Sequence, residues 1–309
     1  MDMVLQRIYN GEQFVFGREG VEIRRMSYFG GEELEVGKTE RITGSSDIVS
    51  FELRRKSNPE RKDGRVGDNY CILPDLDVYA VADGVSNSFS DSRSAVGISK
   101  YLEKLWQKNL DKSGKEISDL SLQKMHNLML KVVSDLQEIF LRHNKKNPEM
   151  FLATTFSMVK IYEKYCLVVS VGDSPVFLQK KEGIEQITIA QDTIRQGTKD
   201  NDGNYLPTSI DELDSAELNF DKRNLQTRQK NPGIIRNNPT SLLGREEGFS
   251  IDFYMRKLKD GNKILLATDG AVKANDILSL DSGNTLSQVA DTLTDNFDGS
   301  DDATILILE

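Results

Sequence analysis

The chain has 309 residues, 38% of them hydrophobic, which is enough for the core of one large domain or two small ones. Its 40 basic and 49 acidic residues give a net charge of −9, which argues against nucleic acid as the main partner because phosphate backbones attract basic surfaces. No apolar run approaches the roughly 20 residues of a membrane span, so we expect no membrane partner. Met1 to Phe16 mixes charged and apolar residues, and we expect no signal peptide there.

Residues 1–44 form a lead segment without a catalytic constellation. Phe14–Phe16 and Val21–Ile23 are candidate short strands, and Gly30-Gly31 then interrupts the chain. We interpret this segment as an N-terminal extension, either a hairpin packed on the core or a contact for another protein.

From residue 45 onward the sequence is typical of an α+β domain, because runs of strands and runs of helices follow one another without βαβ alternation. Apolar stripes of helical spacing predict two long helices, through Ile98–Trp106 and Met125–Phe140. Residues 190–250 lose the strand pattern and become polar. The predicted strands are 47–53, 68–73, 78–82, 152–161, 165–171, 175–179, 184–189, 249–254, 264–268 and 303–308, with short helices over 271–278 and 286–294.

Only two cysteines are present, Cys71 and Cys166, and each lies in an apolar run of strand-like residues. We interpret both as buried thiols, with a disulfide or redox pair as the alternative, because neither has metal-site spacing. Sparing use of cysteine is typical of a reducing compartment and predicts a cytoplasmic location.

Four short acidic turns each adjoin an apolar strand. A single turn of this kind is ordinary turn chemistry, but four of them indicate a shared site. Antiparallel pairing can bring such strand ends to one edge of a sheet, where oxygen ligands suit Mg²⁺ or Mn²⁺ better than zinc. The turns are Asp83-Gly84 after 78–82, Gly172-Asp173-Ser174 after 167–171, Asp269-Gly270 after 264–268, and Asp301-Asp302 before 303–308.

In their order along the chain, these motifs resemble those of the metal-dependent serine/threonine protein phosphatases of type 2C, the PPM family, and of its bacterial members in particular. The resemblance covers residues 45–309 and implies a β-sandwich of two antiparallel sheets flanked by paired helices, with residues 190–250 as a flap beside the active site. The similar stretches are Val81-Ala82-Asp83-Gly84, Ala153-Thr154-Thr155, Val171-Gly172-Asp173-Ser174, Leu266-Ala267-Thr268-Asp269-Gly270 and Asp301-Asp302-Ala303-Thr304.

The resemblance implies an enzyme that hydrolyses phosphoserine and phosphothreonine on proteins through a water bridging two Mn²⁺ or Mg²⁺ ions, with a third ion as an option. The implied partners are a phosphoprotein substrate and, as a further candidate, a cognate kinase. Asp83 would bridge the two ions and Gly84 would add its carbonyl, while Asp269 and Asp301 would complete one position. By the same resemblance, Asp83 and Asp269 are the catalytic pair and Asp173 is the ligand of the third ion.

The second ion position departs from the family pattern. Asp68 is the candidate ligand, but Asn69 follows it where the family more often has a second acidic residue. Arg65 is the candidate for binding substrate phosphate, with Arg61 as the alternative, and a solvated loop arginine is an equally open interpretation. Val85 follows Asp83-Gly84, at the position where several eukaryotic relatives have a proton-donating histidine. Bacterial relatives often lack this histidine too.

Two other functions stay open on the sequence. One is a phosphatase-like binding module that has lost turnover, which Asn69 and Val85 favour and the retained aspartates oppose. The other is a hydrolase of the haloacid dehalogenase type, because Asp75-Leu76-Asp77 matches part of that nucleophile motif. Pro74 interrupts the preceding strand, and a turn explains these aspartates better.

Overall fold

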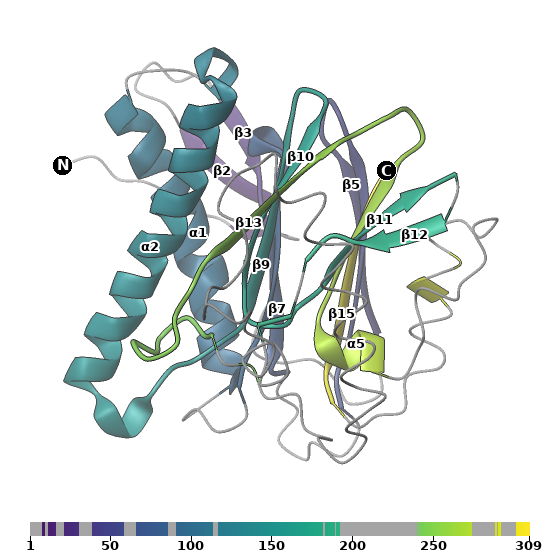
Figure 1. The fold of residues 1–309 in the computed structure, drawn as a ribbon. Coiled ribbons are helices and arrows are strands. Elements are labelled where there is room, and N and C mark those ends of the chain that lie inside the picture. Colours follow the sequence, from purple (N-terminus) through teal and green to yellow (C-terminus); the bar gives the residue numbers. More distant parts are fainter. Residues whose placement is uncertain are drawn as a thin grey trace, which may run out of the picture.

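Two antiparallel sheets stack face to face and helices cover their outer faces (Figure 1). The structure, a computed structural model, includes neither Arg61 nor Arg65 among its described residues. Most of the predicted flap also lies outside the described part. The described residues are 8–9, 12–16, 22–30, 39–58, 66–85, 91–113, 117–181, 183–188, 190–191, 239, 241–273, 288, 290–291 and 301–309.

In the part of the chain that the structure describes, each sheet of the sandwich has six strands, and every pairing between them is antiparallel. This confirms the predicted fold class and agrees with the absence of βαβ alternation. The first sheet has the order β13 (Asp252–Lys257), β10 (Tyr165–Val171), β9 (Phe156–Tyr162), β8 (Val78–Asp83), β7 (Asp68–Leu73), β4 (Tyr28–Phe29). The second has the order β12 (Gly183–Gln186), β11 (Val176–Lys180), β14 (Lys263–Ala267), β15 (Ala303–Leu308), β6 (Ser50–Lys56), β5 (Thr39–Ser45).

The helices follow the predicted apolar stripes. Long helices α1 (Asp91–Ser113) and α2 (Leu122–Lys146) cover the first sheet, and the Ser121 hydroxyl caps α2 by accepting the Lys124 N–H at 3.4 Å. Short helix α5 (Asp269–Lys273) covers the second sheet, and its apolar cluster includes Ala271 and Ala290. The described residues also include three single-turn 3₁₀ helices: η1 (Pro74–Leu76), η2 (Ile117–Asp119) and η3 (Pro148–Met150).

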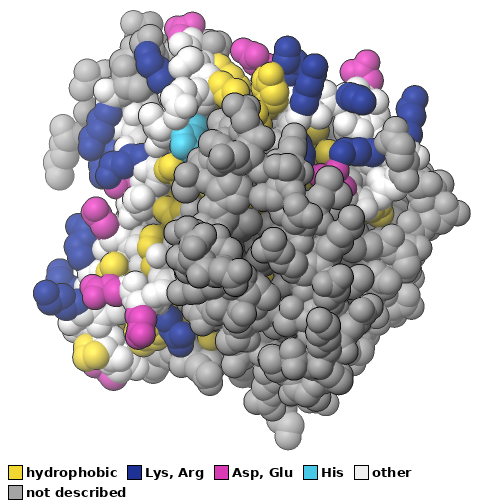
Figure 2. Space-filling view, in the orientation of Figure 1, with side chains coloured by type: hydrophobic (Ala, Val, Ile, Leu, Met, Phe, Trp, Pro, Cys, Tyr) yellow, Lys and Arg dark blue, Asp and Glu magenta, His cyan; other side chains and the backbone are white. Residues whose placement is uncertain are grey.

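The surface of the helical layer carries charges of both signs. Along α2, Lys131 pairs with Asp135 and Arg142 with Glu138, each at a spacing of four residues. In Figure 2, basic and acidic side chains are interspersed along the left margin, the side on which α1 and α2 lie in Figure 1. Among the described residues, no helix combines the length and apolar character needed to cross a membrane.

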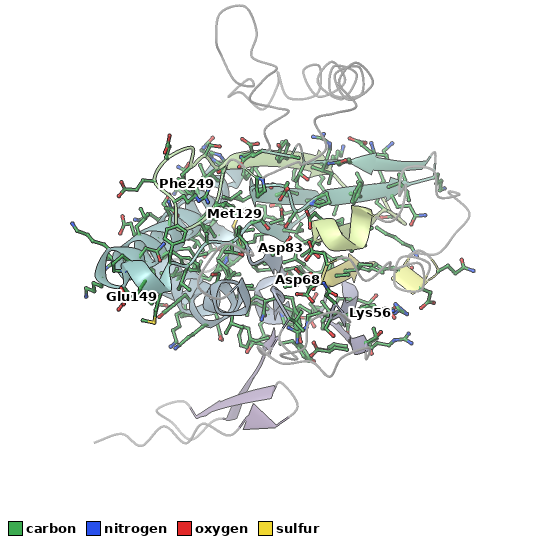
Figure 3. The ribbon with its side chains drawn as sticks, turned by 90° about the horizontal axis from the view of Figure 1, so that it is seen from below. Lys56, Asp68, Asp83, Met129, Glu149 and Phe249 are labelled. Carbon is green, nitrogen blue, oxygen red and sulfur yellow. The ribbon has the colours of Figure 1, made fainter. Side chains whose placement is uncertain are left out.

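The lead segment contributes to three sheets. Its strands β1 (Ile8–Tyr9), β2 (Glu12–Phe16) and β3 (Glu22–Met26) form a small antiparallel sheet that projects from the sandwich in Figure 3, which confirms the two short strands predicted there. The following β4 and β5 pair with β7 and β6. A boundary at residue 44 stays a prediction, but strands on both sides of it belong to the sandwich.

Two details of the core refine the sequence analysis. Strand β6 begins at Ser50 and not at Asp47, because the Ser46 hydroxyl accepts the N–H groups of Ile48 and Val49 and closes a turn. Cys71 and Cys166 are both buried and free, as predicted. Burial raises the pKa of the Cys166 thiol to about 12, which makes it a poor nucleophile.

A buried lysine gives the fold a testable pH dependence. Lys160, on β9, is 2% exposed, and its Nζ donates to the Ile161 carbonyl at 2.6 Å and lies 3.7 Å from Asp77 Oδ2. Burial lowers the pKa of Lys160 to about 8, and Asp77 opposes that shift. In the unfolded chain the pKa returns to about 10.4. Between these values the unfolded state binds more protons, so the free energy of unfolding should rise with pH.

We therefore expect wild type to gain stability relative to Lys160→Met as pH rises from 8 to 10.5, by up to about 3 kcal/mol. Urea unfolding of both proteins at several pH values measures the difference. A difference that is flat across this window would contradict the assignment. Both proteins share all other titratable groups, so the contributions of those groups to the pH dependence cancel in the difference.

Candidate metal centre

Two of the predicted ligands face each other across a hairpin. Asp68 begins β7 and Asp83 ends β8, and the antiparallel register makes them direct partners. Directly opposed residues of an antiparallel pair place their side chains on the same face. Figure 3 shows Asp68 and Asp83 next to each other, near α5.

The second sheet brings two more carboxylates to this edge. Asp269 follows β14 and Asp301 precedes β15, and these strands are antiparallel neighbours. The turns approach so closely that a Cβ added to Gly270 would lie 2.0 Å from the Asp302 carbonyl oxygen. The glycine of the Asp269-Gly270 turn is thus required by packing and not by a positive φ.

The four carboxylates act on one another electrostatically. Burial raises the pKa of Asp83 well above its usual value, and the nearby Asp68, Asp269 and Asp301 raise it further, together with a hydrogen bond to Asp269. Burial also raises the pKa of Asp68, as do Asp302, Asp301 and Asp269, while the Thr268 hydroxyl lowers it. The structure therefore brings Asp68, Asp83, Asp269 and Asp301 into one acidic cluster.

This cluster suits a hard divalent cation chemically, because its donors are carboxylate oxygens held at rigid strand ends. A cation would also relieve the repulsion that raises the pKa of Asp68 and Asp83. Within the described ranges, no three acidic, histidine or cysteine side chains are so arranged that they could hold a metal ion as they stand.

Residues absent from the predicted set hold two of the ligands in place. The Thr268 hydroxyl donates to Asp68 Oδ2 at 2.5 Å and accepts the Thr304 N–H at 2.9 Å. The Thr154 hydroxyl donates to the Asp83 carbonyl at 2.8 Å. Both threonines lie in the motif stretches on which the family resemblance rests. Their place in these motifs was the one feature of the sequence that could have indicated their role.

Asp302 supports the site from behind. Its two carboxylate oxygens accept the N–H groups of Asn58 at 2.7 Å and Gly67 at 2.6 Å. Asp302 is therefore hydrogen-bonded on both sides of residues 59–65, the segment that contains the predicted Arg61 and Arg65. Those two arginines lie outside the described residues, so phosphate binding by Arg65 stays a prediction.

The turn that carries Asp173 lies next to Asp83. The Thr155 hydroxyl and the Ser174 hydroxyl are 2.6 Å apart, and the Thr155 N–H donates to the Asp83 carbonyl at 2.9 Å. Gly84 joins the same edge, because its N–H donates to Gly67 and it bridges Thr154. Ligation by Gly84 and Asp173 remains a prediction that this proximity supports.

Both described ends of the predicted flap meet at Gly172. The Gln191 side chain accepts the Gly172 N–H and the Gln191 N–H donates to the Gly172 carbonyl, each at 2.8 Å. At the other end, the Ser241 carbonyl would lie 3.2 Å from a Cβ added to Gly172, whose φ is +95°. The polar segment therefore leaves and rejoins the sandwich beside Asp173.

Asn69 does not join the acidic cluster through its side chain. Successive residues of a strand point to opposite faces, and the Asn69 amide donates to the Gly30 carbonyl at 3.1 Å. Asp68 is thus the member of the Asp68-Asn69 pair that faces Asp83. The change from an acidic residue to Asn69 removes no carboxylate from the described cluster.

Asp75 and Asp77 lie at the opposite end of β8 from Asp83. Asp75 is exposed in η1, and Asp77 has a left-handed backbone with φ of 44°. The first sheet is antiparallel, whereas the dehalogenase-type interpretation needs a parallel βαβ arrangement. The turn interpretation of these aspartates is therefore the correct one.

Comparisons with known sequences agree with this fold. The family model of Protein phosphatase 2C matches residues 56–303, which span the four acidic turns and most of the sandwich. The chain belongs to the protein phosphatase 2C family. No curated protein sequence matches the chain.

Solved bacterial phosphatases have the same fold. The phosphatase Stp1 from Staphylococcus aureus is 15% identical with a TM-score of 0.57, over 90% of this chain and 98% of its own. MsPP from Mycobacterium smegmatis is 19% identical with a TM-score of 0.55, over 89% and 99%. PstP from Mycobacterium tuberculosis is 15% identical with a TM-score of 0.55, over 84% and 98%.

Proposed function

We propose that this chain is an active, metal-dependent phosphatase that removes phosphate from serine and threonine residues of proteins. The observation that carries the proposal is the meeting of Asp68, Asp83, Asp269 and Asp301 at one edge of the sandwich. The cofactor would be two Mn²⁺ or Mg²⁺ ions. A structure of the PstP catalytic domain is a complex with two manganese ions, which supports a cation pair in this chain too.

When bound, the cations supply an activated water and neutralise charge on the phosphoryl oxygens. The chain's own residues hold and orient them. Asp83 faces Asp68 on its own hairpin and lies close to Asp269, which follows β14 of the second sheet, and this position suits a shared ligand. Thr268 keeps the Asp68 carboxylate oriented through its hydroxyl. Val85 has no proton to give, so the leaving-group proton is assigned to water or to another group.

The alternative is a phosphatase-like module that binds phosphoproteins without turnover. Clustered buried carboxylates repel one another, so a chain that no longer bound cations would gain stability by losing some of them. All four are retained, together with the threonines that orient two of them. This arrangement favours the active enzyme.

The test is hydrolysis of p-nitrophenyl phosphate and of a phosphothreonine peptide by the full-length chain. We expect turnover of both with Mn²⁺ or Mg²⁺ and none with excess EDTA, because the acidic cluster offers oxygen ligands to a cation. Turnover that persists in EDTA would contradict the metal-dependent mechanism. Binding of the phosphopeptide without turnover under every metal condition would support the binding module.

A further inference from the structure

A buried arginine lies directly behind the proposed ligand Asp68. Arg55, on β6, is 1% exposed, and its Nη1 donates to the Asp68 backbone carbonyl at 3.3 Å. The centre of its guanidinium lies 5.5 Å from the centroid of the Tyr70 ring. Asp68 is thus held at two points, by Arg55 on its main chain and by Thr268 on its carboxylate.

The lead segment holds this arginine in place. Glu40, on β5, is the register partner of Arg55, and its Oε2 lies 2.8 Å from Arg55 Nε. Its other oxygen accepts the Tyr70 hydroxyl at 3.0 Å. The carboxylate therefore joins Arg55 to Tyr70 of β7, two residues along the strand from Asp68.

Gly30, at the end of β4, closes the other side of the guanidinium. A Cβ added there would lie 2.5 Å from Arg55 Nη1 and 2.7 Å from Asn69 Oδ1. Both distances are shorter than a Cβ normally makes, so a side chain at this position would require Arg55 or Asn69 to shift. The lead segment thus shapes the space around Arg55 as well as pairing with its charge.

Fold stability alone is a weak reason for this arrangement. Burying an arginine costs desolvation energy that its ion pair only partly offsets. The neighbouring Arg54 is also buried, at 4% exposure, but it pairs with Glu52 and Asp291. Because successive side chains of β6 point to opposite faces, Arg54 is a matched residue of the same strand that faces away from Arg55.

We propose that Arg55 is a positioning residue of the metal centre, and that Gly30 and Glu40 of the lead segment set the affinity for the cation through it. This inference rests on the proposed function, because it takes Asp68 as a cation ligand. When a residue that orients a metal ligand without contacting the metal is replaced, the affinity for the metal typically changes by about 10- to 100-fold. A role of that size would make the lead segment part of the catalytic unit.

The experiment is calorimetric titration of Mn²⁺ into full-length wild type, Arg55→Lys, Gly30→Ala and the control Arg54→Lys. We expect Arg55→Lys to weaken Mn²⁺ binding by about 10- to 100-fold, because the single ammonium of lysine lacks the two spaced donors, Nε and Nη1, with which Arg55 contacts Glu40 and Asp68. Gly30→Ala should weaken it in the same direction without changing any charge. Arg54→Lys should leave the Mn²⁺ affinity unchanged, and circular dichroism verifies that each variant is folded.

Several outcomes would overturn the inference. Absence of Mn²⁺ binding by wild type would refute the proposed function and this inference with it. Binding by wild type, with equal affinity in Arg55→Lys and Gly30→Ala, would refute the inference alone. Equal weakening in Arg54→Lys and Arg55→Lys would show a general effect of buried charge. If Arg55→Lys fails to fold, the Mn²⁺ affinity of Gly30→Ala tests the inference in its place.

Discussion

Replacing Asp83 with Asn is expected to lower kcat for p-nitrophenyl phosphate by at least about 100-fold. Asp83 lies opposite Asp68 and forms a hydrogen bond with Asp269, so it is the carboxylate that joins the two sheets at the proposed site. The amide keeps the size of the side chain but removes the charge that attracts a cation. Steady-state kinetics across a range of Mn²⁺ concentrations would separate weaker cation binding from slower turnover.

Asp75→Asn is the matched control. It makes the same change on an exposed aspartate in η1, at the other end of β8, and should leave kcat nearly unchanged. Asp269→Asn should behave like Asp83→Asn, because Asp269 belongs to the same acidic cluster. A large loss in Asp75→Asn together with full activity in Asp83→Asn would place the active site at the wrong end of the strand.

Without divalent cations, the protein should lose stability as pH rises above about 4. Burial and neighbouring acids raise the pKa of Asp68 and Asp83 in the folded state above the values of the unfolded chain. The folded state therefore binds more protons, and the free energy of unfolding falls as pH rises toward the raised pKa values. Thermal unfolding in EDTA at pH 5.5 and 7.5 measures this trend.

Mn²⁺ should reverse that loss. A ligand at 100 times its Kd stabilises the folded state by about 2.7 kcal/mol for each site, and the gain in Tm should be larger at pH 7.5 than at pH 5.5 because protons compete for the carboxylates. In Asp83→Asn both the pH trend and the gain from Mn²⁺ should shrink. An identical Tm gain in wild type and Asp83→Asn would show that Mn²⁺ binds elsewhere.

Much of the sandwich could be predicted from the sequence, because its buried strands are continuous apolar runs. The bounds of β7, β10 and β15 match the prediction to the residue. The pairing of β5 with β6 could not be predicted, because β5 alternates exposed and half-buried residues and has little apolar character. Edge strands of this kind derive their structure from the neighbour with which they pair.

The site could be predicted in part for the same physical reasons. Acidic turns beside apolar strands identified Asp83, Asp269 and Asp301, since antiparallel topology brings such strand ends together, and the family resemblance added Asp68. Arg55 could not be recognised, because Arg54-Arg55 in a polar stretch is typical of a surface. Its burial follows from β5 and Gly30 closing over β6, which is a tertiary effect.

The central claim is that Asp68, Asp83, Asp269 and Asp301 hold a pair of divalent cations. Anomalous diffraction at the manganese edge, from crystals of the full-length chain grown with Mn²⁺, tests it most directly. We predict two peaks about 3.5–4 Å apart, with the Asp83 carboxylate between them. Absence of any peak at this edge of the sandwich, with a peak elsewhere in the molecule, would contradict the claim.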